Sequence, residues 1–238
     1  MTMVTLARPF RLTIKHKAFL VSLGWVLGLS LSCLTSASTA ENPTDILRRS
    51  TDMVRGNPEA PVTLLEYSDF TCGFCKKFFL ETWPRLLARY VESGHVRFVY
   101  RDFPRSPNGP ALKAAQAARC AGDQQAYWQM HDRLFSSDLR FDSTALQDHA
   151  RAIGLDLQQF VQCLNSEQHI VAIYRDRLEG GNLGIRGTPA FLLFLTADPR
   201  ASTIVHIPGA LPFDVFEQEI DKLLSAASRT SVPPDEGT

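Results

Sequence analysis

Two cysteines separated by two residues, Cys72 and Cys75, lie directly between a strand-like apolar run at 61–70 and a helix-like run that begins at Lys76. Thiols at this spacing can close a small disulfide ring. If Cys72 lies at the helix N-terminus, unpaired backbone N–H groups and the positive end of the helix dipole stabilise its thiolate. The pattern therefore predicts thiol–disulfide exchange at a strand-to-helix turn, with Cys72 as the exposed attacking or attacked sulfur and Cys75 as the resolving one.

Residues 1–40 have the composition of an export signal. They contain four basic and no acidic residues, an apolar run at 18–34 and a stretch of small residues at 35–40. This order is typical of a signal peptide, and small residues at Ser38 and Ala40 favour cleavage before Glu41. The alternative is an uncleaved segment that anchors the chain in a membrane, since the run is near the lower length limit for a span. We expect an exported protein in the periplasm or another extracytoplasmic compartment.

The charge and the cysteine count narrow the function further. The chain has 25 basic and 25 acidic residues, and loss of residues 1–40 leaves 21 basic against 25 acidic. A mildly acidic chain of this kind gives no indication of a nucleic-acid partner. Cys33 lies inside the predicted signal, so four of the five cysteines remain. An even number outside the cytosol fits two disulfide bridges.

Hydrophobic spacing predicts an α/β fold in which a block of helices is inserted between the strands. Buried strands are expected at 62–67 and 96–103, and the helical run between them, 76–91, contains Pro84, which predicts a break. The following residues are almost wholly helical, with segments at 111–121, 124–135, 143–153 and 157–179. Strands return at 189–195 and 203–207, and a closing helix is expected at 212–227.

This pattern predicts the domain organisation. We expect a signal peptide at 1–40, a tether at 41–59, a folded domain at 60–227 with a helical insertion at about 105–183, and a disordered tail at 228–238. Neither the tether nor the tail resembles a dimerisation module, so we expect a monomer.

Four segments resemble the DsbA-like thiol:disulfide oxidoreductases. They are residues 60–70, residues 97–104, residues 117–121 together with Trp128, His131 and Asp132, and residues 184–189. The resemblance covers about 56–224 and implies that the domain at 60–227 has a thioredoxin-like α/β fold with an inserted all-helical subdomain. It implies an enzyme without a bound cofactor that moves disulfides between proteins.

The resemblance also implies a substrate-binding loop at Thr188-Pro189. In this family the corresponding loop contains a cis-proline, faces the two cysteines and receives an extended stretch of substrate; we include Phe74 among the substrate contacts. An X-Pro bond is the one place where a cis peptide costs little. An ordinary trans turn before a strand is the alternative.

Glu66 lies six residues before Cys72, at a position where many relatives of the family have a buried acid. The resemblance implies that it relays a proton to or from Cys75, because resolving a mixed disulfide requires deprotonation of the more buried thiol. Alternation along the strand leaves its face undetermined, so a solvent-facing glutamate is the alternative. We expect Asp69 to be a turn residue that caps the following helix.

The other two cysteines, Cys120 and Cys163, fall on different predicted helices of the insertion. The resemblance implies a structural disulfide between them, and two unpaired buried thiols are the alternative. The six histidines have no tight spacing to the cysteines, so we expect no metal site.

The residues between the catalytic cysteines bear on the direction of exchange. Gly73-Phe74 departs from the Pro-His of strong oxidases, and the Phe74 side chain cannot donate a hydrogen bond to a thiolate. We expect a lowered Cys72 pKa without extreme oxidising power. The resemblance and the export signal favour introduction of disulfides into reduced substrate proteins, with reoxidation by a membrane partner of the DsbB or vitamin K epoxide reductase type. The alternatives are a disulfide reductase or isomerase, and a non-catalytic binding module or chaperone.

Overall fold

The computed structural model describes residues 47–138, 140–199 and 203–230. The predicted signal peptide and most of the predicted tail lie outside these ranges, so their predictions stand as made. Within the described ranges, every helix is too short or too polar to span a bilayer.

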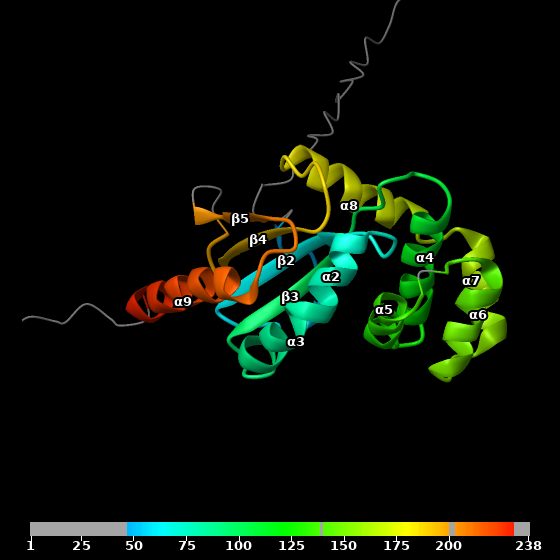
Figure 1. The fold of residues 1–238 in the computed structure, drawn as a ribbon, viewed down its shortest axis with the longest axis horizontal. Helices are drawn as coiled ribbons and strands as arrows, with labels where there is room; N and C mark the ends of the chain where they lie inside the picture. The colour runs from blue at the N-terminus through cyan, green and yellow to red at the C-terminus, as the bar shows by residue number, and fades with distance from the viewer. Residues whose placement is uncertain (1–46, 139, 200–202, 231–238) are drawn as a thin grey trace, which may run out of the picture. The chain divides into compact units, whose positions relative to one another are not determined.

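The described residues form a five-stranded sheet (Figure 1). Its spatial order is β1 (Met53–Arg55), β3 (Val96–Asp102), β2 (Val62–Ser68), β4 (Ala190–Leu195) and β5 (Val205–Pro208). Strands β2 and β3 are parallel, whereas the other neighbouring pairs are antiparallel. Every residue of β2 is buried, as expected for a central strand covered on both faces.

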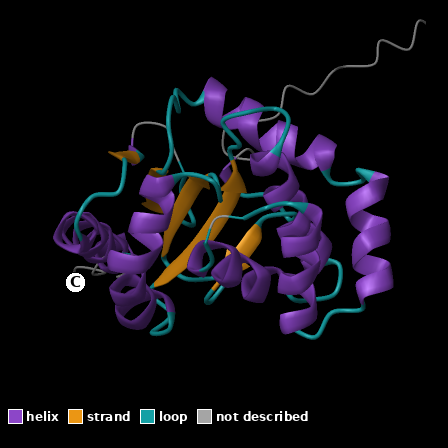
Figure 2. Cartoon of the chain, turned by 45° about the vertical axis from the view of Figure 1, so that its right-hand side comes forward, coloured by secondary structure: helices purple, strands orange, loops and turns teal. Residues whose placement is uncertain are grey.

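The two faces of the sheet belong to different hydrophobic clusters, with helices around the strands (Figure 2). Leu64 and Phe98 lie on the face covered by α2 (Gly73–Glu81), α3 (Trp83–Leu86) and α9 (Phe213–Thr230). Leu65 lies on the opposite face, in the cluster that contains Leu47. Because side chains alternate along a strand, Glu66 shares the α2 face with Leu64.

The helical run after the cysteines breaks where proline predicts it. Helix α2 ends at Glu81, and α3 begins with Trp83-Pro84 and continues into the π-helical turn η1 (Leu87–Val91). Pro84 has no N–H to continue the hydrogen-bond ladder of α2.

Five helices lie between β3 and β4, and α4 to α7 are gathered at one side of the sheet (Figure 1). They are α4 (Pro110–Gly122), α5 (Tyr127–Ser136), α6 (Ser143–Ala152), α7 (Leu157–Ser166) and α8 (Ile170–Asn182). The carboxylates of Asp142 and Asp156 cap α6 and α7 by accepting backbone N–H groups, each at 3.0 Å. The single helix predicted at 157–179 is wrong, because Glu167 adopts a left-handed conformation (φ 57°) that ends α7 without a glycine signal.

The prediction of a tether at 41–59 is wrong for residues 47–55. Strand β1 pairs with β3, and Leu47 is buried. Asp52 accepts a hydrogen bond from Arg101 Nε at 3.0 Å, and Trp128 Nε1 donates to the Val54 carbonyl oxygen at 2.9 Å. These partners lie far along the chain, so the polar segment looks like a solvated linker when it is considered alone. Helix α9 likewise continues past the predicted end at 227, to Thr230.

Candidate redox site

Cys72 lies in the turn between β2 and α2, at the N-terminus of the helix. Its backbone N–H donates to the Asp69 carbonyl oxygen at 2.9 Å. The Asp69 carboxylate accepts the backbone N–H and the hydroxyl of Thr71, both at 2.7 Å. The prediction that Asp69 caps the helix is therefore wrong, since Cys72 itself is the N-cap residue and no side-chain cap is present there. Asp69 instead fixes the turn that presents Cys72.

The surroundings of Cys72 favour its thiolate. Its pKa is lowered to about 5, chiefly by the hydrogen bond from the Cys75 thiol. Burial opposes this effect, while Thr188 and the backbone N–H groups of Cys75 and Phe74 add to it. Unpaired N–H groups of a first helical turn supply such stabilisation without any side-chain donor between the cysteines. At neutral pH Cys72 is therefore mainly a thiolate.

The environment of Cys75 acts in the opposite direction. The thiol is 0% exposed, and burial is the first cause of its raised pKa. The hydrogen bond to Cys72 and the negative charge of an ionised Glu66 raise the pKa of Cys75 further. The two sulfurs, one helical turn apart, therefore have very different pKa values. Cys72 is held as a thiolate and Cys75 as a thiol.

Cys72 is far less exposed than predicted. It is 4% exposed, and it is a free thiol in this structure. The loop before β4 lies against it, because Cys72 Sγ in its thiol form donates to the Thr188 carbonyl oxygen at 3.3 Å. The expectation of an openly exposed sulfur is therefore corrected to a nearly covered one, although Cys75 is covered more completely.

The Thr188–Pro189 peptide is cis and lies in the loop against the cysteines. The Pro189 carbonyl oxygen accepts the backbone N–H of Gly209 at 2.8 Å, which ties this loop to the end of β5. Thr188 Oγ1 is buried and has no hydrogen-bond partner among the described residues. A thiolate cannot donate a hydrogen bond to the Thr188 carbonyl oxygen. When Cys72 is ionised, the Thr188 hydroxyl can instead donate to the Cys72 thiolate, which lowers the Cys72 pKa.

A groove of about 350 Å³ begins at this loop. It is lined by residues 184–191 and 206–209, and it includes Thr188 and Pro189. On α2, next to Cys72, the Phe74 side chain is 67% exposed. An apolar groove on one side of the sulfur and an exposed aromatic ring beside it suit an extended peptide with apolar side chains.

Glu66 lies on the face of the sheet that contacts α2, opposite Tyr100 in the register of β2 with β3. It is 2% exposed, which rules out the solvent-facing alternative. Burial raises its pKa to about 8, the neighbouring Ser68 hydroxyl lowers it in part, and the Cys72 charge raises it again. Its Oε1 has no hydrogen-bond partner within the described part of the chain. Glu66 is therefore mainly a neutral acid at pH 7, close enough to both thiols to influence them.

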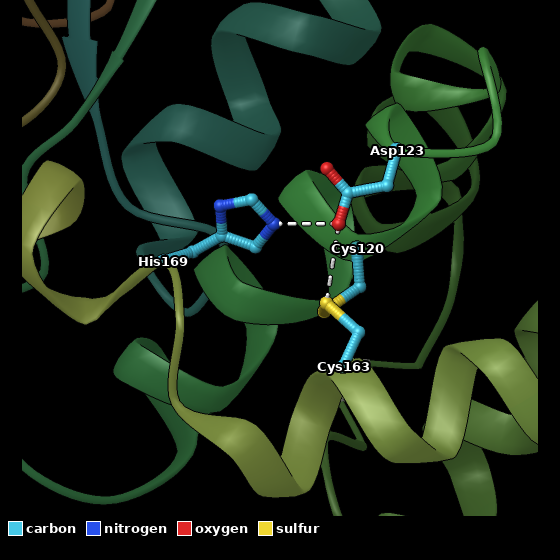
Figure 3. Close-up of side chains that lie close together, drawn as sticks. All are labelled: Cys120, Asp123, Cys163 and His169. Atoms are coloured by element: carbon cyan, nitrogen blue, oxygen red, sulfur yellow. Dashed lines mark hydrogen bonds and ion pairs between the residues drawn. A yellow bond between two sulfur atoms is a disulfide. The ribbon is translucent and has the colours of Figure 1, made fainter.

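A disulfide joins Cys120 on α4 to Cys163 on α7, across a sequence separation of 43 residues (Figure 3). Asp123 and His169 lie beside it, at the end of α4 and directly before α8. One ligand atom from each of the four residues lies within 4.8 Å of the others. Sequence spacing did not reveal this set, because three separate helix ends contribute to it. The absence of a metal site stays a prediction.

His131, in the segment that contributed to the family resemblance, is buried between aromatic rings. Its ring centroid lies 4.9 Å from that of Tyr100 and 5.0 Å from that of Phe135. Burial lowers the pKa of His131, so the imidazole is neutral at pH 7 and packs as part of the core.

Comparison with known proteins agrees with this geometry. A family model described as thioredoxin matches residues 48–193. The solved structure of Wolbachia pipientis alpha-DsbA1 has a TM-score of 0.72 and 28% identity to this chain, and covers 79% of this chain and 99% of its own. The probable disulfide bond formation protein D of Bacillus anthracis is 25% identical over 186 residues, which are 74% of this chain and 79% of that protein.

A segment of a larger protein also matches. The Na(+)/H(+) antiporter NhaA 1 of Salinispora arenicola is 36% identical over 144 residues, which are 60% of this chain but 21% of the antiporter. The chain thus spans about a fifth of that relative, and the likeness concerns one segment of it.

Proposed function

This chain belongs to the thioredoxin family, in its DsbA-like group of thiol:disulfide oxidoreductases, and from that premise we propose that it introduces disulfides into reduced substrate proteins outside the cytoplasm. The observation that carries the proposal is the position of Cys72 at the N-terminus of α2, where its Sγ lies 3.3 Å from the carbonyl oxygen of the cis Thr188–Pro189 peptide and Cys75 is buried one helical turn on. This arrangement lowers the pKa of Cys72 and raises that of Cys75. Residues 1–40 would serve as the signal that exports the chain from the cytoplasm.

The proposed reaction begins with a Cys72–Cys75 disulfide. A substrate thiolate attacks Cys72 Sγ, a mixed disulfide forms, and Cys75 leaves as a thiolate that takes up a proton. A second substrate thiolate then attacks the substrate sulfur of the mixed disulfide, and Cys72 leaves as its stabilised thiolate. The substrate loses two electrons and two protons. The enzyme pair gains the two electrons, Cys75 gains one proton, and the other proton goes to water because Cys72 remains a thiolate.

Glu66 is the proposed proton donor to Cys75 in this direction. Its carboxyl is neutral at pH 7 because its pKa is about 8, whereas the raised pKa of Cys75 makes that thiolate a strong base. When the pair is reoxidised, the same carboxylate accepts the Cys75 proton. Proton transfer by a positioned side chain contributes typically about 10²–10⁴-fold to a rate.

The stabilised Cys72 thiolate favours oxidation of substrates over their reduction. Thioredoxin, with a thiol pKa of about 7, has a potential of about −270 mV. A Cys72 pKa of about 5 stabilises the reduced form more than a thiol pKa of about 7 does, which predicts a potential less negative than that of thioredoxin. A value near −270 mV would instead identify a reductase.

Cys75→Ala tests whether the chain acts by exchange at all. An oxidoreductase with this substitution should accumulate mixed disulfides when its Cys72 thiolate attacks the disulfides of client proteins, visible as mass shifts that a reductant reverses. The double variant Cys72→Ala/Cys75→Ala is the matched control and should form none. Equal recovery of clients by both variants would indicate a binding module or chaperone.

Continued turnover requires an electron acceptor for the reduced pair. We propose a membrane redox partner of the DsbB or vitamin K epoxide reductase type, acting on a monomeric enzyme. The groove at Thr188-Pro189 supports this proposal, since the same contact beside Cys72 would serve a partner cysteine as well as a substrate cysteine.

A further inference from the structure

The Cys120–Cys163 disulfide lies against a carboxylate and an imidazole that the exchange reaction does not use (Figure 3). Asp123 Oδ2 lies 3.4 Å from Cys163 Sγ and 2.8 Å from His169 Nε2. Gln168 Nε2 donates to the same oxygen at 2.8 Å. The four residues of the cluster come after Cys72 and Cys75 in the sequence. They are contributed by the end of α4, by α7 and by the residues before α8.

The donor atoms match the chemistry of zinc. Two thiolates, an imidazole nitrogen and a carboxylate oxygen form an S₂NO set, and Zn²⁺ binds these donors in tetrahedral sites. Zinc–ligand bonds of about 2.0–2.3 Å place the ligand atoms of such a site about 3.3–3.8 Å apart. The four atoms here lie within 4.8 Å of one another, so the most widely spaced of them need to approach by up to about 1 Å. Asp123 Oδ2 and His169 Nε2, which are 2.8 Å apart, need to separate by about half an ångström.

The sulfurs are available only when the bridge is open. The Cα atoms of Cys120 and Cys163 are 5.7 Å apart, and rotation about the Cα–Cβ bonds can separate the sulfurs once the S–S bond is broken. The hydrogen bond from Gln168 would then hold the Asp123 carboxylate in place as an outer-shell contact.

We propose that Cys120, Asp123, Cys163 and His169 bind one Zn²⁺ ion when their disulfide is reduced, so that the metal and the disulfide are alternative cross-links of the helical insertion. With a phosphine as reductant, phosphorus loses two electrons and takes oxygen from water, and the two sulfurs gain the electrons and the two protons. Zn²⁺ then displaces both thiol protons. The resulting site has a net charge of −1, from two thiolates, one carboxylate and one divalent cation.

The test uses the full chain with Cys72→Ser and Cys75→Ser, so that the exchange cysteines cannot bind metal. Co²⁺ is added as a spectroscopic substitute for zinc before and after reduction by the phosphine. The reduced protein should bind one equivalent, with a thiolate-to-cobalt charge-transfer band that Zn²⁺ abolishes. The oxidised protein should show no such band. A reduced protein without the band, or equal Co²⁺ binding in both redox states, overturns the proposal.

Two ligand variants retain both cysteines and therefore separate binding from bridge formation. His169→Ala and Asp123→Ala should each weaken Zn²⁺ binding by the reduced protein more than about 100-fold, beyond the usual effect of an outer-shell change. His95→Ala, at an exposed histidine elsewhere, is the matched control and should leave the affinity unchanged. Equal affinities in His169→Ala and His95→Ala would refute the site.

A second measurement covers the case in which reduction unfolds the insertion. Zinc binding is then coupled to folding, so Zn²⁺ should raise the melting temperature of the reduced protein as its concentration increases. The same titration should not affect His169→Ala. A reduced protein whose melting temperature is unaffected by Zn²⁺ argues against the site even if the apo insertion is unfolded.

Discussion

Glu66→Gln should stabilise the protein at neutral pH while slowing its exchange reaction. The glutamate is buried beside the two thiols, and burial is the main reason for its pKa of about 8. Glutamine keeps the shape and stays neutral at every pH. The substitution therefore removes the cost of burying a group that ionises freely in the unfolded chain.

The size of the effect follows from the two pKa values. A carboxyl with a raised folded pKa contributes stability that is fully present below its unfolded value, 4.5, and is lost as the pH rises through about 8. At pH 7 the unfolded chain has released the proton and the folded chain has kept it. At about 1.36 kcal/mol per pH unit, this difference lowers the free energy of unfolding of the wild type by about 3 kcal/mol at pH 7.

The assay is denaturant unfolding of the oxidised wild type and the oxidised Glu66→Gln protein at pH 5 and pH 7. With the bridge closed, Cys72 and Cys75 do not titrate, and burial, the first cause of the raised Glu66 pKa, acts without the smaller contribution of the Cys72 charge. The stability advantage of the variant should grow by about 2 to 3 kcal/mol between the two pH values. Exposed Glu59→Gln is the matched control and should show no such growth. An identical pH dependence for wild type and Glu66→Gln would refute the buried, neutral carboxyl.

Three further variants test other parts of the structure. Thr188→Val should raise the Cys72 pKa, because it removes a group that lowers it; an unchanged titration of the ultraviolet thiolate absorbance would contradict that contact. Replacing both cysteines of the bridge between α4 and α7 by alanine should lower the free energy of unfolding by about 4 kcal/mol from loop entropy, and a loss below about 1 kcal/mol would exclude a structural role. Asp52→Asn should lower the free energy of unfolding by about 3–5 kcal/mol, because it leaves Arg101, which is 1% exposed, buried with a weaker partner. A loss below about 1 kcal/mol in denaturant unfolding would argue against the ion pair.

Local patterns were sufficient for the main elements of this fold. The apolar runs at β2, β3 and β4 and the helical spacing of α2 through α6 predicted those elements to within a few residues. Pro84 marked the break after α2 because its effect on a helix is local. The division between α7 and α8 was missed, since a left-handed glutamate gives no signal in the sequence.

Contacts between segments distant in the sequence determined the features of the fold that local patterns did not predict. Strand β1 and the residue before it looked like a linker because their partners come from β3 and α5: Arg101 bonds Asp52, and Trp128 bonds Val54. The same reason explains why Asp123 and His169 were not linked to the bridge, and why Cys72 is covered by a loop more than a hundred residues away. Residues close in sequence interact through local backbone geometry, which periodicity and turn residues report directly.

The position of the two cysteines at a strand-to-helix turn was readable from the chain itself, and with it the chemistry of a thiol pair. The difference between the pKa values of Cys72 and Cys75 could not be predicted from the sequence, because a pKa depends on burial and on charges brought close by packing. Alternation along β2 allowed Glu66 either face, and only the register with β3 and the helix against it placed the carboxyl beside the thiols. Local sequence thus specified which groups react, and tertiary packing set their protonation.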